Sequence, residues 1–391
     1  MEKKRIKILY VHHGHSRGGA PRSLSFLINQ LDKSLYEPYV VCCADILRNR
    51  MLFEAVGANV INGKYMGAWH GSTVTGMSLK VLKYNLIHAL PTYIGMSKIM
   101  KLIQPDIVHL NSTCLFIAAK AVKHYNNKIP VVCHIREPLL QNKWGNILMS
   151  SNEKVIDHYI SIDRYDATSL NNTKVPISII YNFVDFRLYN DKVKSDCLRK
   201  ELSINMEDTI LLYLARVIKQ NGTLDMLIAL EPLLKKKKNI HLCIVGIEED
   251  SNDEYQKKVQ IIARKYCNVH VLHFRNDIPN VIASSNVMLV PFQQPHFARS
   301  IIEAGAMGVP CIASDIGGLQ ELVVDGITGI LFDHQSFKGF ADACMKLSTD
   351  IHLRKMMGQE SKKYAHKNFN AIENARYTFE VYEDLLKFHF V

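Results

Sequence analysis

The feature that most constrains the fold is an alternation of short apolar runs and small-residue segments between residues 287 and 332. The run at 287–291 predicts a buried strand, and further strands are expected at 309–313 and Gly329–Phe332. A helix is expected to begin near Arg299, where small residues permit close packing on a sheet. Strand, loop and helix in this repeated order predict parallel α/β structure, with loops that lead into helix N-termini at one sheet edge. Free N–H groups at such termini favour anions and sugar oxygens.

The same alternation continues through the rest of the chain. Further apolar runs predict strands at 5–13, 39–44, 60–61, 106–111, 131–134, 157–162, 177–181, 209–215, 240–245 and 269–274. A chain of 391 residues is long enough for two domains. We therefore expect an α/β protein with two doubly wound parallel-sheet (Rossmann-like) domains at 1–185 and 206–368, joined by a polar, loop-like linker at 186–205. The helix expected within 369–391 has no strand partner, so we expect it to pack back on the first domain.

Net charge and cysteine content indicate the cellular compartment of the protein and the kinds of ligand that it binds. The formal net charge of +11 reflects either a solubility bias or attraction to anions, such as nucleotide phosphates or the inner face of a membrane. The basic residues are scattered and no nucleic-acid motif is present, so nucleic acid is not an expected partner. Nine cysteines without a CxxC pair or zinc-ligand spacing fit a cytoplasmic protein without a metal site. The first apolar run is too short for a signal peptide, and no window of about 18 apolar residues predicts a transmembrane helix.

Residues 65–103 interrupt the regular pattern. Apolar residues there alternate at helical spacing with four lysines, Lys80, Lys83, Lys98 and Lys101. One interpretation is an amphipathic helix pair that packs on the sheet. The other is a basic, apolar surface that contacts an anionic membrane or a lipid-linked substrate.

Candidate binding residues share one position, at or just after the ends of predicted strands. They are Gly18, Gly19, His134, Asn182, Arg216, Gly246, Glu303, Ser314, Asp315 and Gly318. Because ligands bind outside the carboxyl ends of strands in open parallel sheets, two such sheets facing across a cleft would place these residues around a ligand. The arginine suits a diphosphate, and the carboxylate of Glu303 suits ribose hydroxyls. The glycine-rich loop at 12–19 is not G-x-G-x-x-G, so it does not indicate a nicotinamide cofactor.

The stretch 291–332 resembles the donor-binding signature of retaining GT-B glycosyltransferases of the family 4, or group 1, type. The matching positions are Glu303-Ala304, Ala306, Gly308, Pro310, Ala313-Ser314, Gly317-Gly318, Glu321, Val323, Asp325-Gly326, Thr328-Gly329 and Leu331. We expect a helix after Gly318 with Glu321 in its first turn. Looser similarities extend over nearly the whole chain: they are the glycine loop at Gly18-Gly19-Ala20, the cleft histidine at His134, the interdomain segment at Tyr181-Asn182 with Asp185, and the diphosphate arginine at Arg216.

The resemblance implies a GT-B fold in which the first domain binds the acceptor and the second binds a nucleotide-diphosphate sugar. It implies transfer with retention, without a metal or a cofactor, to a glycan or lipid-linked glycan in surface polysaccharide biosynthesis. The implied catalytic residues are Glu303 at the ribose, Arg216 at the diphosphate, and His134. The implied donor-binding residues are Gly18, Gly19, Lys219, Gly246, His296, Phe297, Ala298, Arg299, Ser314, Asp315, Gly317 and Gly318. Peripheral contact with the inner membrane face is a further expectation.

Two positions depart from the family pattern. Pro295 replaces the first of two glutamates, and His296, Phe297 and Ala298 replace Gly-Phe-Gly after it. We expect His296, or the N–H groups that follow it, to supply the lost contact to the sugar. Asn221 replaces the diphosphate lysine, with Lys219 as the nearest alternative cation. These departures leave two alternatives: a sugar-nucleotide 2-epimerase-like enzyme on the same fold, or a non-catalytic relative that binds a partner.

Overall fold

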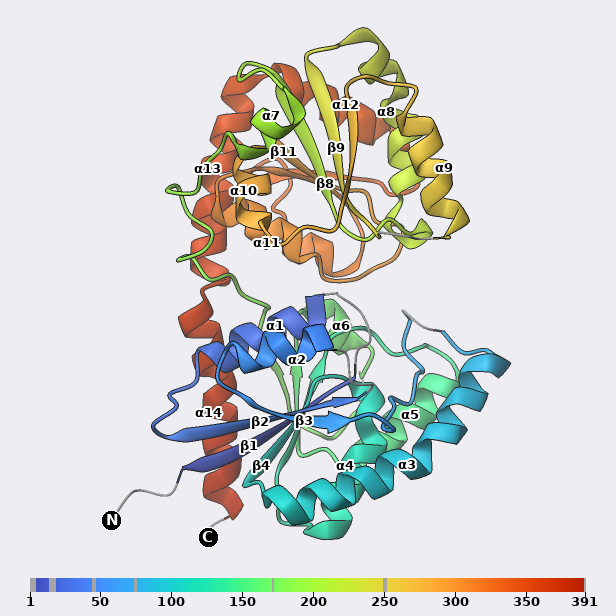
Figure 1. The fold of residues 1–391 in the computed structure, drawn as a ribbon, viewed down its shortest axis with the longest axis vertical. Coiled ribbons are helices and arrows are strands. Elements are labelled where there is room, and N and C mark those ends of the chain that lie inside the picture. The colour runs from blue at the N-terminus through green and yellow to red at the C-terminus, as the bar shows by residue number, and fades with distance from the viewer. Residues whose placement is uncertain are drawn as a thin grey trace. The chain divides into compact units, whose positions relative to one another are not determined.

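The chain folds into two compact α/β units. The computed structural model describes residues 5–13, 19–43, 47–73, 76–170, 172–248 and 252–389. The first unit contains Met1–Asn182 and Ala371–Val391, and the second contains Phe183–Asn370. Each unit has a parallel sheet with helices packed on it (Figure 1). The expected class, an α/β protein with two doubly wound domains, is confirmed.

The first unit is built on a sheet of seven strands in its described residues, in the order β3-β2-β1-β4-β5-β6-β7. All neighbouring strands in this order pair in parallel. The strand order reverses between β1 and β4, the kind of switch point at which doubly wound sheets bind ligands. The strands are β1 (Ile6–His12), β2 (Tyr36–Cys43), β3 (Asn59–Gly63), β4 (Ile107–Leu110), β5 (Val131–Ile135), β6 (His158–Ser161) and β7 (Ile177–Ile179).

Alternate residues of these strands face two different helical layers. Leu9, Val11 and Val108 belong to a core that also contains residues of α3 and α4. On the opposite face, His109 contacts Tyr382 of α14, the red helix beside β1 and β2 in Figure 1. The expected return of the last helix to the first domain is therefore observed. The helices of this unit are α1 (Gly19–Asn29), α2 (Leu47–Glu54), α3 (Leu79–Ile103), α4 (Phe116–Tyr125), α5 (Lys143–Glu153), α6 (Arg164–Thr168) and α14 (Ala371–His389).

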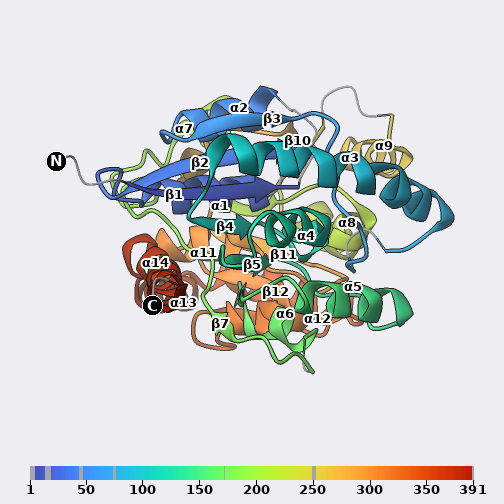
Figure 2. The same cartoon turned by 90° about the horizontal axis from the view of Figure 1, so that it is seen from below.

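The stretch 65–103 does not form the helix pair that the first of the two interpretations predicts. Its described residues form a single helix, α3, which continues through Pro91 for 25 residues and lies beside α4 (Figure 2). The segment before it runs along α3 instead. Asn85 bonds both backbone groups of His70 at 2.9 and 2.8 Å, and the hydroxyl of Thr92 accepts from the Gly67 N–H at 2.9 Å. These buried side chains satisfy backbone groups that a helix would otherwise have paired internally.

The second unit has six strands in the part that the structure describes, in the order β10-β9-β8-β11-β12-β13. All pairs are parallel. The strands are β8 (Thr209–Leu214), β9 (Ile240–Ile247), β10 (Val269–His273), β11 (Val287–Val290), β12 (Cys311–Ser314) and β13 (Gly329–Phe332). The helices are α7 (Cys197–Leu202), α8 (Thr223–Lys236), α9 (Glu254–Ala263), α10 (Ile278–Ala283), α11 (Arg299–Ala306), α12 (Phe337–Thr349) and α13 (Ile351–Asn368).

Small residues in α11 permit a close helix–helix contact. A Cβ on Gly305 would lie 2.9 Å from the hydroxyl of Ser361 in α13, and a Cβ on Gly358 would lie 2.2 Å from the Gly308 carbonyl. The small residues predicted to bring this helix close to a sheet therefore also bring it close to α13. This packing fixes α11, which carries several of the candidate site residues.

Two segments of the second unit differ from the prediction. The linker at 186–205 contains α7, because buried Arg199 anchors that turn by donating to the Asn205 and Asp208 carbonyls at 2.6 and 3.0 Å. The helix expected to carry Glu321 in its first turn is instead a short 3₁₀ segment, Gly317–Glu321, in which Glu321 is the last residue. The short 3₁₀ segment leads directly into the turn before β13.

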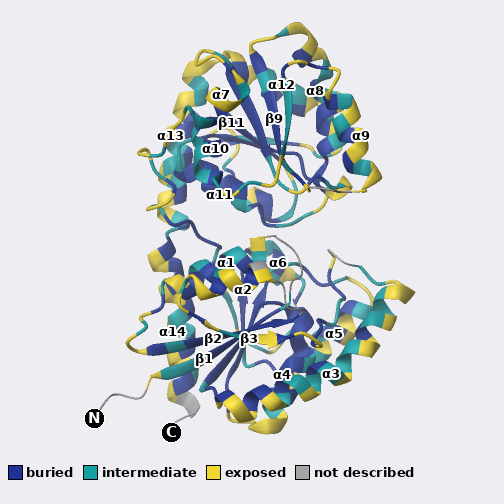
Figure 3. Ribbon diagram, in the orientation of Figure 1, coloured by how far each residue is buried: buried dark blue, intermediate teal, exposed yellow. Residues whose placement is uncertain are grey.

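In both units the central strands are buried, whereas the edge strand β3 has exposed residues (Figure 3), and β7 and β10 are also partly exposed. Among the described residues, no helix is both long and apolar enough to cross a membrane. The helices instead bury one face each against a sheet or a neighbouring helix, as expected of surface layers around a central sheet.

Candidate functional site

Four neighbouring strands of the second unit end in loops that carry most of its predicted site residues. β9, β8, β11 and β12 are adjacent and parallel, so their carboxyl ends lie at one sheet edge. Gly246 lies at the end of β9 and Arg216 follows β8, while the loop at 291–298 follows β11. Ser314 is the last residue of β12. The sheet therefore brings these parts of the sequence together.

The backbone of Arg216 is held in place by two hydrogen bonds to its carbonyl oxygen. The Tyr213 hydroxyl donates to this oxygen at 2.8 Å, and the side-chain amide of Asn221 donates to it at 2.9 Å. The Thr223 hydroxyl in turn donates to the Tyr213 oxygen at 2.8 Å. The guanidinium of Arg216 itself is exposed. A rigid backbone thus presents a solvent-accessible cation at the carboxyl end of the central strand β8.

Two glycines allow the loops to approach each other. Gly222 has φ of 65°, and a Cβ there would lie 2.0 Å from the Pro291 carbonyl oxygen. Gly246 has φ of 133°, and a Cβ there would lie 2.1 Å from the Ala215 carbonyl oxygen. Both a positive φ and such a contact with backbone exclude a side chain. Gly246, predicted as a binding residue, thus has a structural role beside Arg216.

Asn221 and Lys219 have different environments. Asn221 is buried and its amide is bonded to the Arg216 carbonyl. Lys219 lies in the same 3₁₀ turn, Lys219–Asn221, and is exposed. Asn221 therefore supports the arginine backbone, and Lys219 supplies the accessible second cation of this loop.

The loop after β11 is organised by an aromatic stack. The ring of His296 stacks on Phe292, with centroids 4.2 Å apart and planes inclined by 14°. Its Nδ1 lies 3.2 Å from the Gln294 carbonyl oxygen. Burial lowers the pKa of His296 to about 4, against the opposing hydrogen bond to Gln294, and the positive charge of Arg216 lowers it further. His296 is therefore a neutral imidazole near the Arg216 cation, while Phe297 and Ala298 are buried.

Helix α11 begins at this loop and carries a buried ion pair. Arg299 Nε and Glu303 Oε1 are 3.3 Å apart, one helical turn from each other, and both side chains are largely buried. Arg299 also donates to the Phe183 carbonyl at 3.0 Å, at the start of the second unit. Ala298, at the N-cap position, provides no side-chain cap. The N-terminus of α11 thus lacks a side-chain cap, although the Ile301 N–H donates to the Ala298 carbonyl at 3.2 Å, and helix N-termini favour anions.

In the loop after β12, the groups accessible to a ligand belong mainly to the backbone rather than to side chains. Ser314 is fully buried, and its hydroxyl lies 3.5 Å from the Val290 carbonyl oxygen. Asp315 is exposed and accepts a hydrogen bond from Gln320 at 2.7 Å. Gly317 adopts φ of 55° at the start of the 3₁₀ segment, and Gly318 is buried. Of this group, Asp315 has the side chain most accessible to a ligand.

In the first unit, His134 belongs to a buried polar cluster. It lies near the end of β5, with Nδ1 3.0 Å from His109 Nε2. His109 Nδ1 lies 2.5 Å from the Tyr382 hydroxyl of α14. Burial lowers the pKa of His109 to about 3 and that of His134 well below its usual range, and the charge of Arg136 acts in the same direction. Both rings are therefore neutral at physiological pH.

A second polar group lies at the same edge of this sheet. Asn111 contacts His12 Nδ1 at 3.1 Å and accepts a hydrogen bond from Arg136 Nε at 2.6 Å. Arg136 also donates to the side chain of Asn182 at 3.1 Å. The structure thus brings Asn182 to the sheet edge predicted for it. Gly19 starts α1, whereas Gly18 lies outside the described residues.

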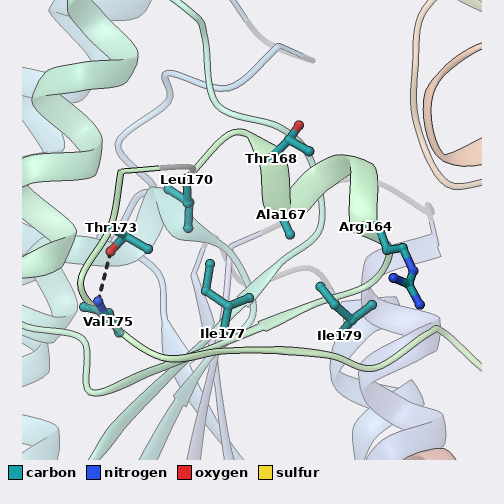
Figure 4. A pocket seen from close by; sticks show the side chains of 8 residues that line it. All are labelled: Arg164, Ala167, Thr168, Leu170, Thr173, Val175, Ile177 and Ile179. Carbon is teal, nitrogen blue, oxygen red and sulfur yellow. Dashed lines mark hydrogen bonds between the residues drawn. The ribbon is translucent and has the colours of Figure 1, made fainter.

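A hollow of about 350 Å³ lies elsewhere in the first unit, between α6 and the edge strand β7 (Figure 4). Ala167, Ile177 and Ile179 form its apolar wall, and Arg164 lies at one end. None of the residues predicted for the site lines this hollow. It is separate from the polar residues at the carboxyl ends of the strands.

Comparison with known families agrees with this arrangement of loops and strands. Residues 195–364 match the family described as glycosyl transferases group 1, and residues 17–188 match Glycosyltransferase Family 4. The chain belongs to the group 1 and family 4 glycosyltransferases. The boundary between the two family matches in this glycosyltransferase lies close to the boundary between its two units.

Curated relatives cover most of the glycosyltransferase. N-acetyl-alpha-D-glucosaminyl L-malate synthase of Bacillus anthracis is 23% identical over 72% of this chain and 75% of its own length. The UDP-Gal:alpha-D-GlcNAc-diphosphoundecaprenol alpha-1,3-galactosyltransferase of Escherichia coli is 24% identical over 77% of this chain and 81% of its own. Among solved structures, HepE of Anabaena in complex with UDP-glucose has a TM-score of 0.80 and 18% identity, with 97% and 100% of the two chains covered. This similarity shows the shared GT-B fold.

In the first unit of the glycosyltransferase, the residues that support His134 were not predicted from the sequence. His109, Tyr382 and Arg136 were not singled out, although they contact His134 or influence its charge. His109 and Arg136 could have been found from the sequence, because polar residues stand at every second position from His109 and from His134. This spacing places each of the two sets on one face of its strand. Tyr382 had no such signal, because its contact joins residues 273 positions apart.

The buried histidines predict that the glycosyltransferase loses stability in mild acid. In the unfolded chain a histidine binds a proton below a pKa of about 6.5, whereas His109 resists protonation down to about 3. Stability from this group is therefore complete above about pH 6.5 and is lost as the pH falls toward 3. For His109 alone we expect a loss of about 2 kcal/mol between pH 7 and 5, measured by urea unfolding of the first unit.

The control is His109→Gln, which keeps an amide N–H but cannot titrate. The free energy of unfolding of this variant should fall less than that of the wild type between pH 7 and 5, by about 2 kcal/mol. Contributions from carboxylates cancel in the comparison. Equal losses in the two proteins would contradict a neutral, buried His109.

Proposed function

We propose that this glycosyltransferase moves a sugar, with retention of anomeric configuration, from a nucleoside-diphosphate sugar to a glycan or lipid-linked glycan in polysaccharide biosynthesis. The observation that carries the proposal is the exposed Arg216 cation beside the open N-terminus of α11, at one edge of the second sheet. Similar chains support the donor class, since HepE of Anabaena was solved with UDP-glucose. The printed name of the Escherichia coli relative includes a UDP-sugar donor and a diphosphoundecaprenol-linked acceptor.

The proposed donor contacts follow from the chemistry of the second unit. Arg216 and Lys219 bind the diphosphate, because both are exposed cations on one loop. The N–H groups at the start of α11 donate to phosphate or sugar oxygens. Glu303 accepts hydrogen bonds from the ribose hydroxyls, and its buried partner Arg299 holds it in position. The backbone at Asp315 and Gly317 completes the sugar side of the pocket.

The reaction we propose needs stabilisation of a leaving group. The bond between the sugar C1 and the diphosphate oxygen breaks, and an acceptor hydroxyl oxygen bonds to C1 on the same face. The acceptor proton passes to the departing phosphate oxygen. Negative charge grows on the diphosphate as its bond to C1 lengthens, so a fixed Arg216 cation and aligned N–H dipoles bind the transition state more tightly than the ground state.

The loop at Pro295 is the part of this site that we connect with the donor sugar. Proline cannot accept a hydrogen bond through its side chain, so a carboxylate contact to sugar hydroxyls is absent at this position. His296 offers a neutral imidazole instead, fixed by its stack on Phe292. We propose that His296 contacts the sugar in place of the missing carboxylate.

A donor panel with product identification tests the proposed function. The purified chain is incubated with UDP-, GDP-, ADP- and dTDP-sugars, with and without EDTA, and products are identified by mass spectrometry and NMR. We expect one sugar nucleotide to be consumed with release of nucleoside diphosphate, retention at C1 and no loss of activity in EDTA. Epimerised sugar nucleotide without nucleoside diphosphate would instead support the epimerase alternative. Absence of binding to any donor in a thermal-shift screen would support a non-catalytic role.

The outer face of α3 supports a membrane-associated acceptor. Leu86, Ile87, Leu90 and Ile94 are 46–66% exposed along this face. The four exposed lysines of the same helix, at positions 80, 83, 98 and 101, lie before and after these residues. An apolar centre with lysines at both ends suits an anionic lipid surface. We therefore propose that the protein is cytoplasmic and binds peripherally at the inner membrane face.

This proposal predicts binding to anionic vesicles at low salt. The wild type should float with phosphatidylglycerol vesicles in 20 mM salt and much less in 500 mM salt, because salt screens the lysines. Replacing the four α3 lysines by glutamine should weaken binding at least about tenfold, since each lysine near such a surface contributes about 1 kcal/mol. The same change at Lys235–Lys238 is the control and should have little effect. Equal binding of both quadruple variants would contradict a specific role of α3.

A further inference from the structure

A chain of three polar side chains crosses the first unit and ends at His134. The Tyr382 hydroxyl of α14 lies 2.5 Å from His109 Nδ1, and His109 Nε2 lies 3.0 Å from His134 Nδ1. Tyr382 and His109 are 0% exposed and His134 is 6% exposed. Within the described residues, the contact with His109 is the hydrogen bond found for the His134 side chain. Its other nitrogen, Nε2, therefore forms the outer end of the chain.

The proton positions along this chain depend on each other. Burial and the nearby Arg136 charge keep both imidazoles neutral. A neutral imidazole has one N–H and one bare nitrogen, and the partner of one nitrogen decides which tautomer is present. Once the direction of the Tyr382–His109 hydrogen bond is set, the direction of the His109–His134 bond follows. The state of His134 Nε2 follows from both.

Acid–base strength sets that direction. A phenol is intrinsically a stronger acid than a neutral imidazole N–H, and a bare imidazole nitrogen accepts better than a phenol oxygen. Burial raises the pKa of Tyr382, but it disfavours an imidazole anion in the same way, so this order is kept. Tyr382 is therefore the donor and His109 Nδ1 the acceptor. Tyr10 interacts with the Tyr382 hydroxyl, and its ring lies 5.3 Å from that of His109. Tyr10 stays uncharged because burial raises its pKa, and a Tyr10 hydroxyl that donates to the Tyr382 oxygen leaves the Tyr382 proton to His109.

We propose that Tyr382 and His109 are positioning residues that hold His134 as the neutral Nε2–H tautomer, so that His134 donates a hydrogen bond to a sugar oxygen rather than acting as a base. His109 Nε2–H donates to His134 Nδ1, which leaves the His134 proton on Nε2. The tautomer itself is a property of the first unit and needs no substrate. Only the contact with a sugar oxygen rests on the proposed function.

The tautomer is tested directly by NMR of the full-length protein with ¹⁵N-labelled histidine. Long-range ¹H–¹⁵N spectra distinguish protonated from bare ring nitrogens, and His109→Gln and His134→Gln spectra assign the two residues. We expect both histidines to carry their proton on Nε2 from pH 6 to pH 8. A proton on Nδ1 of His134 in the wild type would overturn the proposal, whatever the enzyme activity.

Matched variants test whether Tyr382 and His109 act through His134. Tyr382→Phe removes the donor and should give mixed tautomers of His134, whereas Tyr159→Phe, which removes another fully buried hydroxyl of the same unit, should leave the spectrum unchanged. His109→Gln keeps an N–H for His134 Nδ1, and His109→Leu removes it. We expect His109→Leu to lower kcat for donor consumption about tenfold, as loss of an orienting partner does elsewhere, and His109→Gln to restore most of it.

The two parts of the inference fail separately. If Tyr382→Phe folds but leaves the His134 tautomer unchanged, the positioning role is wrong. If the tautomers change as expected while His109→Leu and His109→Gln consume donor at the wild-type rate, the contact with a sugar oxygen is wrong. If the wild type consumes no nucleotide sugar at all, the proposed function fails, and the NMR result still decides the tautomer.

Discussion

Replacing Arg216 by alanine should lower kcat/KM for sugar transfer about 100- to 1,000-fold and leave the fold intact. The guanidinium is exposed, so its removal creates no cavity, and the backbone stays bonded to Tyr213 and Asn221. The expected loss of about 2.7–4 kcal/mol in transition-state binding is typical of removing one group that stabilises developing negative charge. It is measured from initial rates of nucleoside-diphosphate release with the donor found in the panel.

Two further variants separate charge from geometry at Arg216. Arg216→Lys keeps the charge but loses the bidentate fork, so it should recover only part of the rate. Arg264→Ala removes an exposed arginine from the same unit and should leave the rate unchanged. If Arg216→Ala also transfers sugar at the wild-type rate, the diphosphate is held elsewhere and the proposed site is wrong.

The second large effect is expected at Glu303, where stability and activity should fall together. Glu303→Ala removes the carboxylate beside the buried guanidinium of Arg299. Breaking a buried ion pair from one side typically costs about 3–5 kcal/mol, because the remaining charge stays desolvated. Urea unfolding of the second unit measures this loss, and donor binding should be lost in the same variant.

A double variant distinguishes the ion pair from the ligand contact. Arg299→Leu with Glu303→Leu removes both charges and should be more stable than Glu303→Ala, although it should not transfer sugar. Glu303→Gln keeps the shape of the side chain and tests the charge alone, while Glu207→Ala, an exposed position, controls for loss of a surface carboxylate. Full transfer activity in Glu303→Gln would remove Glu303 from the proposed site.

Elements with strong local patterns were predicted well. β13 was predicted with the bounds that it has, and the start of α11 at Arg299 was predicted from the loop before it. Both follow directly from an apolar run or from small residues that repeat at helical spacing. The helices α5 and α9 were not predicted, because their sequences are largely polar and lack a clear apolar stripe.

Features that depend on distant contacts were not predictable in the same way. The segment before α3 lies along that helix because Asn85 and Thr92 bond its backbone, and no local pattern shows those bonds. Most site residues were found from their positions after strands, since parallel topology places strand ends at one edge. Their partners were not found, because Asn221 and Tyr382 act through buried hydrogen bonds that only the folded chain creates.

The position of α14 has a consequence for the order in which this protein matures on the ribosome. Residues 371–389 complete the first unit, yet they are synthesised after the whole of the second unit. The second unit can therefore fold first, even though its sequence begins later. Until α14 emerges, the sheet face with Tyr10 and His109 lacks its covering helix and is a candidate for chaperone binding. A ribosome stalled on residues 1–370 followed by an unstructured linker long enough to span the exit tunnel should hold a protease-resistant second unit and a first unit that is still cut readily.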